Sequence, residues 1–475
     1  MKQKKLVHAL SMLALLSACG GGGGGGGNTP PTSGAPSPNP PVASNGCSVR
    51  ERQDWAGAQI NEWYLFPETL PTNPSPAGYA TVTAYIDYLT ATARAQGRDR
   101  FFTYLTSIAE ENAYYTSGST AGFGFRLSFD STQQRLFVAE AFEGAPALAA
   151  GIDRGTEILA IGTSADTLRT IAAIVSAEGE GGINNAIGPS TAGTVRVLRI
   201  SNAAGIRDVT VTKMDYELLP VSTRYGSRII DDGGRRVGYL NLRTFISSAD
   251  PALRQAFANF RAEGITEIII DLRYNGGGLV SIAELMGDLL GGNRTSTDVL
   301  SYTTFRPSKA AENETRFFRP QPQSVSPVRI AFIGTGGTAS ASELVINAFI
   351  PYLGANAALV GTNTYGKPVG QIALDRTQCD DRLRIVAFAT QNRDRQGDYF
   401  SGLADTVQAS CRAGDDLAFP LGDPRESSVA RALDFLAQRP CSSISGGVSG
   451  AAVVDRELLT PERPSTAQRE VPGLF

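Results

Sequence analysis

The sequence contains a single histidine, His8, which lies in an amino-terminal segment that we expect to be removed. Without histidine, the mature chain has no imidazole base for a Ser-His-Asp or Cys-His hydrolase mechanism. The same absence excludes a zinc site with histidine ligands. We therefore expect no metal and no other cofactor, and any hydrolytic reaction must use a different base.

Positive charge is not in excess either. Lys and Arg together number 43 against 46 for Asp and Glu, which gives a formal net charge of −3. A nucleic-acid partner is therefore not expected, because such proteins depend on a basic surface. The 475 residues are 42% hydrophobic and 19% charged, which excludes global disorder and predicts several domains.

Long apolar runs are absent after residue 18, and the run before it, residues 6–16, is too short to span a bilayer. Its charged start and small-residue ending are typical of a secretory signal peptide. The ending Leu16-Ser17-Ala18-Cys19 resembles a bacterial lipoprotein signal, which implies a signal peptide over 1–18 and a lipid on Cys19. An ordinary signal peptide with an incidental cysteine is the alternative.

Residues 19–46, rich in Gly, Pro and Ser, are predicted to be a flexible linker. Gly20, and not Asp, follows Cys19, and in Gram-negative lipoproteins the absence of Asp at this position implies sorting to the outer membrane. We therefore expect a periplasmic protein that is held at the membrane by its lipid anchor.

Cysteine is scarce, with five in the chain. If Cys19 carries lipid, an even number remains in an oxidising compartment, which predicts two disulfides. We prefer the pairs Cys379–Cys411 and Cys47–Cys441 among the three possible connectivities. Four free buried thiols are the alternative.

The remaining chain divides into regions that differ in composition and in the spacing of their apolar residues. Residues 47–117 carry apolar side chains at helical spacing and are predicted to form a small helical domain. From about residue 220, strands alternate with helices, which predicts an α/β catalytic core over 216–441. Residues 442–475 are rich in Gly, Ser and Pro, and we expect them to be a loosely ordered tail. The expected strands of the core are 267–272, 329–333 and 357–360, and the expected helices are 253–262, 279–290 and 340–349.

Between these regions, residues 118–215 resemble a PDZ domain, through the run Gly122-Phe123-Gly124-Phe125 and the Ala-Pro-Ala and Ala-Gly-Ile segments that follow it. In such a domain, backbone N–H groups of the glycine-flanked loop bind the end of a peptide, which pairs with the adjoining strand edge. The resemblance implies that Gly122, Phe123, Gly124 and Phe125 bind polypeptides with apolar C-termini. An unrelated small β domain is the alternative.

Ser340 lies where a buried strand is predicted to turn into a helix. The N–H groups and positive dipole of a helix start favour negative charge, as on the oxyanion of acyl transfer, although N-capping is the commoner role for serine there. After residue 18, lysine occurs only at Lys213, Lys309 and Lys367. A desolvated lysine can lose its proton, so Lys367 is the candidate base for Ser340, and an ordinary surface lysine is the alternative.

The chain resembles the S41 family of serine peptidases, the C-terminal processing or tail-specific proteases, over roughly residues 55–436. The resemblance rests on Asp-Leu-Arg-Tyr-Asn-Gly-Gly-Gly at 271–278, Thr-Ala-Ser-Ala-Ser-Glu at 338–343 and Gly-Lys at 366–367 with Gln371. It implies a multi-domain α/β fold: a ClpP/crotonase-like core preceded by a PDZ domain and a helical domain. It also implies Ser340 as nucleophile, Lys367 as general base, Gln371 as the group that orients the lysine, and Gly277 and Ala341 as oxyanion donors.

Two features depart from the family pattern. The spacing from Ser340 to Lys367 is slightly longer than usual, and Pro351 stands where some members carry an acid. Ser342 is a rival nucleophile, and Glu343, a possible second acid, is explained by the helix dipole.

The sequence therefore favours a periplasmic endopeptidase that selects polypeptides by their tails. A catalytically silent, PDZ-type peptide-binding lipoprotein is the alternative, and an adaptor or regulatory partner remains open. We expect a free tail at the end of the sequence. The alternative is that Val471-Pro472-Gly473-Leu474-Phe475, which are apolar, occupy the PDZ groove of this chain or of a neighbour.

Overall fold

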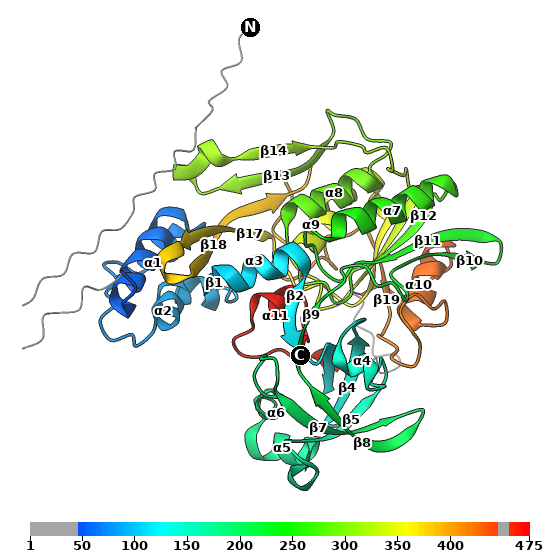
Figure 1. Ribbon diagram of the computed structural model, residues 1–475. Helices are drawn as coiled ribbons and strands as arrows, with labels where there is room; N and C mark the ends of the chain where they lie inside the picture. The colour runs from blue at the N-terminus through cyan, green and yellow to red at the C-terminus, as the bar shows by residue number, and fades with distance from the viewer. Residues whose placement is uncertain (1–45, 445–455) are drawn as a thin grey trace, which may run out of the picture. The chain divides into compact units, whose positions relative to one another are not determined.

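The central layer of the protein is a six-stranded sheet with the order β10-β11-β12-β15-β16-β19, seen in a computed structural model that describes residues 46–444 and 456–475 (Figure 1). All neighbours in this sheet are parallel except β10 and β11, which form an antiparallel pair. The strands are β10 (Ser227–Asp232), β11 (Arg235–Asn241), β12 (Glu267–Asp271), β15 (Arg329–Gly334), β16 (Ala357–Gly361) and β19 (Ala409–Arg412).

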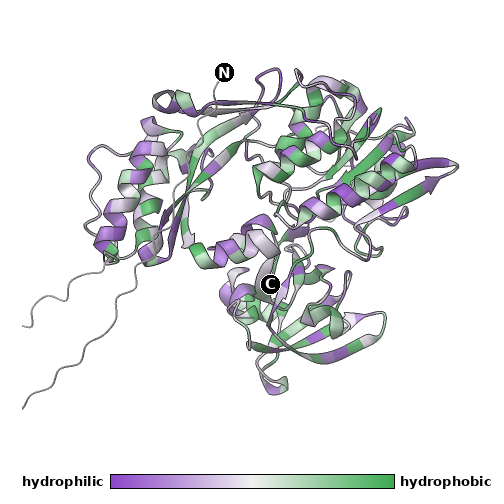
Figure 2. Cartoon of the chain, turned by 45° about the horizontal axis from the view of Figure 1, so that its top comes forward, coloured by the Kyte–Doolittle hydropathy of each residue, from purple (hydrophilic) through white to green (hydrophobic). Residues whose placement is uncertain are grey.

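Helices cover both faces of this sheet, because its strands are apolar on both sides. Along β12, Ile268 and Ile270 belong to one hydrophobic cluster, whereas Ile269 belongs to the cluster on the opposite face. The first cluster includes side chains of α7 (Ala249–Ala262), α8 (Val280–Leu290) and α9 (Ala341–Leu353), and the second includes side chains of α10 (Ser427–Leu436). Figure 2 shows the strands as mostly hydrophobic and the helices as striped. The strands and helices expected from the sequence in this core are confirmed.

A second sheet has the order β1-β18-β13-β14, with β17 paired to β18. Its hydrophobic cluster joins Leu383 and Ile385 of β18 to Ile60 and Ile86 of the two amino-terminal helices. The predicted helical segment is therefore present, but it shares its core with strands more than 280 residues further along the sequence. The elements are α1 (Val49–Trp63), α2 (Val82–Ala95), β1 (Tyr104–Ser107), β13 (Val299–Phe305), β14 (Glu314–Phe317), β17 (Val369–Arg376) and β18 (Asp381–Gln391).

Residues 118–215 form the expected β-rich part. Its sheet has the order β20-β3-β4-β5-β7-β8, with β6 paired to β5; the first of these strands, β20 (Arg456–Leu458), comes from outside the region. The helices α5 and α6 pack into its core. A separate two-stranded sheet of β2 and β9 lies at the two ends of this region. The elements are β2 (Ser119–Gly122), β3 (Phe125–Asp130), β4 (Arg135–Ala141), α4 (Pro146–Ala149), β5 (Glu157–Gly162), β6 (Arg169–Thr170), α5 (Ile171–Glu178), α6 (Gly181–Ile187), β7 (Val195–Asn202), β8 (Gly205–Thr212) and β9 (Met214–Glu217).

Residues 456–475, which we call the strap, differ from the expected loose tail. They form β20 (Arg456–Leu458), which pairs with β3, and α11 (Thr466–Glu470), which follows a capping box on Ser465. Val471, Leu474 and Phe475 are buried. The expectation of loose order is wrong for the strap, because these apolar side chains gain more from burial than the ordering of a short segment costs.

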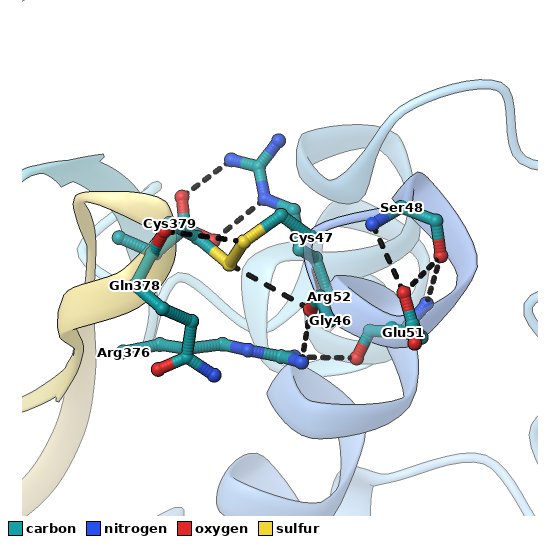
Figure 3. Close-up of a disulfide and its surroundings, with 9 residues drawn as sticks. Gly46, Cys47, Ser48, Glu51, Arg52, Arg376, Gln378 and Cys379 are labelled. Carbon is teal, nitrogen blue, oxygen red and sulfur yellow. Dashed lines mark hydrogen bonds and ion pairs between the residues drawn. A yellow bond between two sulfur atoms is a disulfide. The ribbon is translucent and has the colours of Figure 1, made fainter. Parts of the chain in front are cut away.

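The predicted disulfide pairing is also wrong, although two disulfides are present. Cys47 is bonded to Cys379 and Cys411 to Cys441, with Cα–Cα distances of 5.5 Å and 5.4 Å. Cys47 lies just before α1, which packs beside β18, and Arg376 near Cys379 donates to the carbonyl oxygen of Glu51 (Figure 3). The pairing follows from this docking of α1, which spacing along the chain does not reveal.

Other predictions concern residues outside the described part of the chain. The signal peptide over 1–18, the lipid on Cys19 and the linker up to residue 45 fall there. Within the described residues, no helix is both long and apolar enough to cross a membrane.

Candidate active site

The residues predicted to carry chemistry gather at the carboxyl edge of the parallel strands. The loop after β12 contains Gly277, the loop after β15 contains Ser340, and the loop after β16 contains Lys367. Side chains at this edge of a parallel sheet come from separate loops and can converge on one ligand, as they do in many α/β proteins. The fold therefore brings together three segments that are far apart in the sequence.

Ser340 lies directly before α9 and has an unusual backbone conformation. Its φ is 55° and its ψ is −114°, a positive-φ region that residues other than glycine rarely occupy. Strain of this kind is typical of functional sites, where the surrounding structure enforces it.

Gly277 lies against this turn. A Cβ atom at Gly277, whose φ is +124°, would be 2.8 Å from Ser340 Cβ and 3.3 Å from the backbone nitrogen of Ala341. The structure therefore brings Ser340 and the two predicted oxyanion donors, Gly277 and Ala341, to one place. The N–H group of Gly277, however, donates a 2.9 Å hydrogen bond to Asn275 Oδ1. That donor is already paired in this structure.

Asn275 also fixes the turn around Ser340. Its carbonyl oxygen accepts hydrogen bonds from the backbone N–H of Ala339 and the hydroxyl of Ser342, both at 3.0 Å. Ser342 is fully buried, so its hydroxyl has a structural partner and no access to the cleft. This arrangement argues against Ser342 as the nucleophile.

Lys367 is held by the residue predicted to orient it. Lys367 Nζ donates a 2.9 Å hydrogen bond to Gln371 Oε1 and lies 4.7 Å from the centre of the Phe102 ring. Gln371 in turn donates through Nε2 to the carbonyl oxygen of Phe102. Burial lowers the pKa of Lys367 below its ordinary value of 10.5, and the carboxylate of Glu470 opposes that shift.

Glu343 plays a larger part than the sequence indicated. Its buried carboxylate accepts the N–H groups of Ser340 at 3.0 Å and Lys367 at 2.7 Å through Oε2. Through Oε1 it accepts the hydroxyl of Thr364 at 2.6 Å and the N–H of Gly366 at 2.7 Å. Glu343 therefore ties the Ser340 turn to the Lys367 loop. The Ser-x-x-Glu spacing of a capping box was the available signal, but it reveals only the bond to Ser340.

The Asp-Leu-Arg part of the 271–278 motif has a structural role here. Arg273 is fully buried and makes ion pairs with Asp271 at 2.9 Å, Glu426 at 2.9 Å and Asp415 at 3.1 Å. This network fixes the start of the glycine turn, because a buried cation held by three carboxylates has little freedom to move.

Ser340 and Lys367 are not joined directly. Across residues 46–444 and 456–475, no hydrogen bond links Ser340 Oγ to Lys367 Nζ. Lys367 and Gln371 line a cleft of about 700 Å³, whose lining also includes Ala339, the residue before Ser340. The strap enters the same cleft with Arg469 and Glu470. The site in this structure is therefore covered by part of the chain itself.

The second predicted binding site is the run from Gly122 to Phe125. The side chains of Phe123 and Phe125 are fully buried. The N–H groups of Gly124 and Phe125 both donate to the carbonyl oxygen of Phe475, at 2.9 Å and 3.3 Å. Residues 473–475 of this chain thus lie at this loop, and the expectation of a free tail is wrong for them.

Within residues 46–444 and 456–475, no group of three or more His, Cys, Asp or Glu side chains is arranged to hold a metal ion.

Comparisons with known proteins agree with this arrangement. The sequence profile of Peptidase family S41 matches residues 236–402. Carboxyl-terminal-processing peptidase 3, chloroplastic, of Arabidopsis thaliana is 26% identical over 336 residues, which is 69% of this chain and 61% of that protein. The carboxyl-terminal-processing protease of Synechocystis sp. is 27% identical over 255 residues, 53% of this chain and 54% of its own length. This chain thus spans between half and two thirds of each relative.

Among solved structures, a proposed S41 protease from Bacteroides fragilis has a TM-score of 0.63 and 22% identity, over 81% of this chain and 97% of that one. The predicted mixed α/β multi-domain fold is therefore confirmed. Residues 236–402 thus resemble the S41 peptidases, and the relatives that the chain matches include carboxyl-terminal-processing proteases.

Proposed function

We propose that this chain is a serine endopeptidase that acts on polypeptides, with Ser340 as nucleophile and Lys367 as general base. One observation carries the proposal: Glu343 binds the backbone N–H groups of both Ser340 and Lys367, so the two loops are fixed side by side at one cleft. The S41 match and the carboxyl-terminal-processing homologues support the same reaction class.

In this reaction, Ser340 Oγ attacks the carbonyl carbon of the scissile bond, and its proton passes to the neutral amine of Lys367. The resulting ammonium group protonates the leaving amine, which breaks the peptide bond and leaves an acyl group on Ser340. Water, deprotonated by the same lysine, then releases the acyl group. Lysine suits this role here because burial lowers the pKa of its amine, while Gln371 holds Nζ in place.

The oxyanion is assigned to two backbone donors. Ala341 is the first residue of α9, so its N–H has no acceptor within the helix and points with the positive end of the helix dipole. Gly277 supplies the second N–H. Since that group is bonded to Asn275 in this structure, the 275–277 turn must rearrange before Gly277 can contact an oxyanion.

Substrate selection is assigned to residues 118–215, acting as a PDZ-type domain. The edge of β3 that residues 473–475 cover in this structure, together with the loop from Gly122 to Phe125, would bind polypeptides that end in apolar residues. This assignment draws support from the backbone pairing between this edge and residues 473–475.

We place the protein in the periplasm, tethered by a lipid on Cys19, on the basis of the Leu-Ser-Ala-Cys pattern at 16–19. Metabolic labelling with a fatty acid in a Gram-negative host tests this. The label should be incorporated into the wild-type chain and lost in the Cys19→Ala variant, and labelling of neither chain would refute the tether.

The catalytic proposal is tested by incubating the protein with unfolded casein and, separately, with a fluorophosphonate probe that labels activated serines. Wild-type protein should cleave casein and carry one probe adduct on Ser340, whereas Ser340→Ala should do neither. Equal cleavage by both proteins would refute the role of Ser340. If neither protein cuts or is labelled, yet both bind apolar-ended peptides, the silent peptide-binding function replaces this one.

A further inference from the structure

The strap extends the sheet of the β-rich region at its edge. Phe475 and Phe125 exchange backbone hydrogen bonds, with N–H to O distances of 3.0 Å and 3.3 Å. The N–H of Leu127 donates to the carbonyl oxygen of Gly473 at 2.8 Å, and Leu474 lies opposite Arg126 in an antiparallel bridge. Residues 473–475 thus bind β3 as an added strand, in the way that peptides bind an exposed sheet edge.

The apolar side chains at the end of the strap pack into two separate hydrophobic clusters. Phe475 is 3% exposed and belongs to the hydrophobic cluster that contains Phe123 and Ile183. Leu474 is 3% exposed and packs in a separate cluster with Phe142. Gly473 has a positive φ of +85°, and a Cβ there would lie 2.8 Å from Arg126 Cγ. The fit combines two apolar pockets with a close backbone approach, which are the elements of a specific peptide site.

Further back along the strap, α11 lines the cleft that contains Lys367, through Gln468, Arg469 and Glu470. The carbonyl oxygen of Glu470 accepts the N–H of Gly276 at 2.9 Å, in the glycine turn beside Ser340. The carboxylate of Glu470 accepts the hydroxyl of Tyr115 at 3.0 Å, and its negative charge favours the protonated form of Lys367. Arg469 donates to the carbonyl oxygen of Phe101 at 2.8 Å.

The strap does not lie in the cleft as a substrate would. Residues 466–470 are helical, and the N–H of Val471 still donates to the carbonyl oxygen of Ala467 at 2.8 Å. Peptides bound for cleavage are extended, because an extended backbone exposes the scissile carbonyl to the nucleophile and the oxyanion donors. This segment therefore blocks the cleft and is not in a conformation to be cut.

We propose that the β3 groove recognises peptides ending in Leu-Phe or similar large apolar pairs, and that residues 473–475 are its built-in occupant, so that such a peptide opens the catalytic cleft by displacing the strap. This inference rests on the proposed function for its catalytic part, but the binding part stands alone. Groove and cleft are coupled because two residues, Val471 and Pro472, join α11 to the strand formed by residues 473–475.

Because the strap is part of the same chain, its covalent connection determines how much free peptide is needed to displace it from the groove. A tethered occupant has an effective concentration on the order of millimolar, so a free peptide must be supplied in that range to compete with it. Removing the two apolar anchors of the strap should remove that competition. The groove is then free in all molecules. The apparent affinity for a free peptide should therefore rise by the inverse of the fraction of molecules in which the strap had left the groove free.

Binding is measured first, on the Ser340→Ala protein, so that no cleavage interferes. The probe is a fluorescent peptide with the sequence Val-Pro-Gly-Leu-Phe, and its affinity is read by fluorescence anisotropy. The doubly substituted variant Leu474→Asp, Phe475→Asp should bind the probe at least about tenfold more tightly than the protein whose strap is unsubstituted. The Arg463→Ala variant, at an exposed position of the strap, should bind as the unsubstituted protein does. Equal affinity in all three proteins would overturn the proposal.

Activity is measured second, with casein and an intact Ser340. The doubly substituted variant should cleave faster than wild type without added peptide, and millimolar Val-Pro-Gly-Leu-Phe should accelerate the wild type only. A peptide ending in Asp-Asp serves as the control and should have no effect. Tighter probe binding without any cleavage by either protein would refute the catalytic function and leave the groove assignment intact. If the proteins are active but their rates change neither with the double substitution nor with added Val-Pro-Gly-Leu-Phe, the proposed role of the strap in closing the cleft is refuted.

If the double substitution unfolds the protein, hydrogen exchange on the wild type gives the same information. Excess Val-Pro-Gly-Leu-Phe should increase exchange at the backbone amides of α11, since displaced residues 466–470 lose their packing. Unchanged protection of α11 at saturating peptide would overturn the proposal.

Discussion

Lys367 and Gln371 form a 2.9 Å hydrogen bond between Nζ and Oε1, and this bond holds the amine at the wall of the catalytic cleft. The groups that act on the charge of Lys367 come from several elements: Glu470 and Arg469 of the strap, Asp99 ahead of β1, and Arg384 of β18. Their combined effect is smaller than that of burial, which lowers the pKa of the amine.

The first prediction concerns pH. Activity needs the neutral amine, so the rate should rise with pH through the lowered pKa of Lys367 and level off below the ordinary lysine value of 10.5. Lys367→Arg should lose about 10²–10⁴ in kcat, because guanidinium does not release its proton at these pH values. The control Lys309→Arg, at a lysine that pairs with Glu62 far from the cleft, should keep the wild-type profile. A wild-type rate in Lys367→Arg would exclude Lys367 as the base.

The second prediction concerns Glu343 as a positioning residue. In Glu343→Gln, one oxygen must serve four donors, so the bonds to Ser340 and Lys367 or those to Thr364 and Gly366 are lost. Hydrogen bonds to a charged group contribute about 1.5–3 kcal/mol each, so unfolding by urea should occur at clearly lower concentration. The value of kcat should fall while KM for casein changes little.

Glu312→Gln, at an exposed position, provides the matched control for the loss of one negative charge. If Glu343→Gln loses stability but keeps the wild-type kcat and pH profile, Glu343 supports the fold only and does not position the site.

The third prediction concerns Gly277. In Gly277→Ala, the new Cβ would lie 2.8 Å from Ser340 Cβ at a φ of +124°, so the turn beside the nucleophile must shift. Loss of one oxyanion donor lowers kcat by about 10²–10³, and we expect a fall of that order. The control Gly181→Ala, where no atom lies within 4 Å of the added Cβ, should be active. Near-normal turnover by Gly277→Ala would remove this glycine from the oxyanion site.

The fourth prediction concerns the disulfides. Peptide mapping without reduction should recover Cys47 joined to Cys379 and Cys411 joined to Cys441. Breaking the first bond with Cys47→Ser and Cys379→Ser should cost about 2–4 kcal/mol of the free energy of unfolding, by relaxing a constraint on the unfolded chain. The second bond closes a loop with a separation of 30 residues against 332 for the first, so its removal should cost less. Recovery of a Cys379–Cys411 peptide would contradict the structure.

Local patterns in the sequence were sufficient for the central sheet and its edge. The isoleucines at 268–270 are apolar on both faces of a strand, as a covered parallel sheet requires, and the glycines at 276–278 mark the turn that approaches Ser340. Lys367 was predicted as the base because few residues in the chain could replace histidine. Ser340 was predicted from its place before a helix and Gln371 from the S41 resemblance, and all three roles stay predictions.

Long-range contacts were not accessible in this way. The pairing of Cys47 with Cys379 depends on α1 docking beside β18, and the role of Glu343 depends on the path of the Lys367 loop. The order of the strap was missed because its polar and proline-rich first half outweighs Val471, Leu474 and Phe475 in any average over composition. A short apolar segment is stabilised by its partner, and that partner is more than 300 residues away.

The covalent bond between Cys47 and Cys379 also has a mechanical consequence. Cys379 lies in the connection between β17, the strand that carries Gln371, and β18. A pull on the chain ahead of Cys47 is therefore transmitted through sulfur to that hairpin, and it bypasses the non-covalent contacts of α1. A tether attached on the amino-terminal side would load the same hairpin that holds the lysine's hydrogen-bond partner.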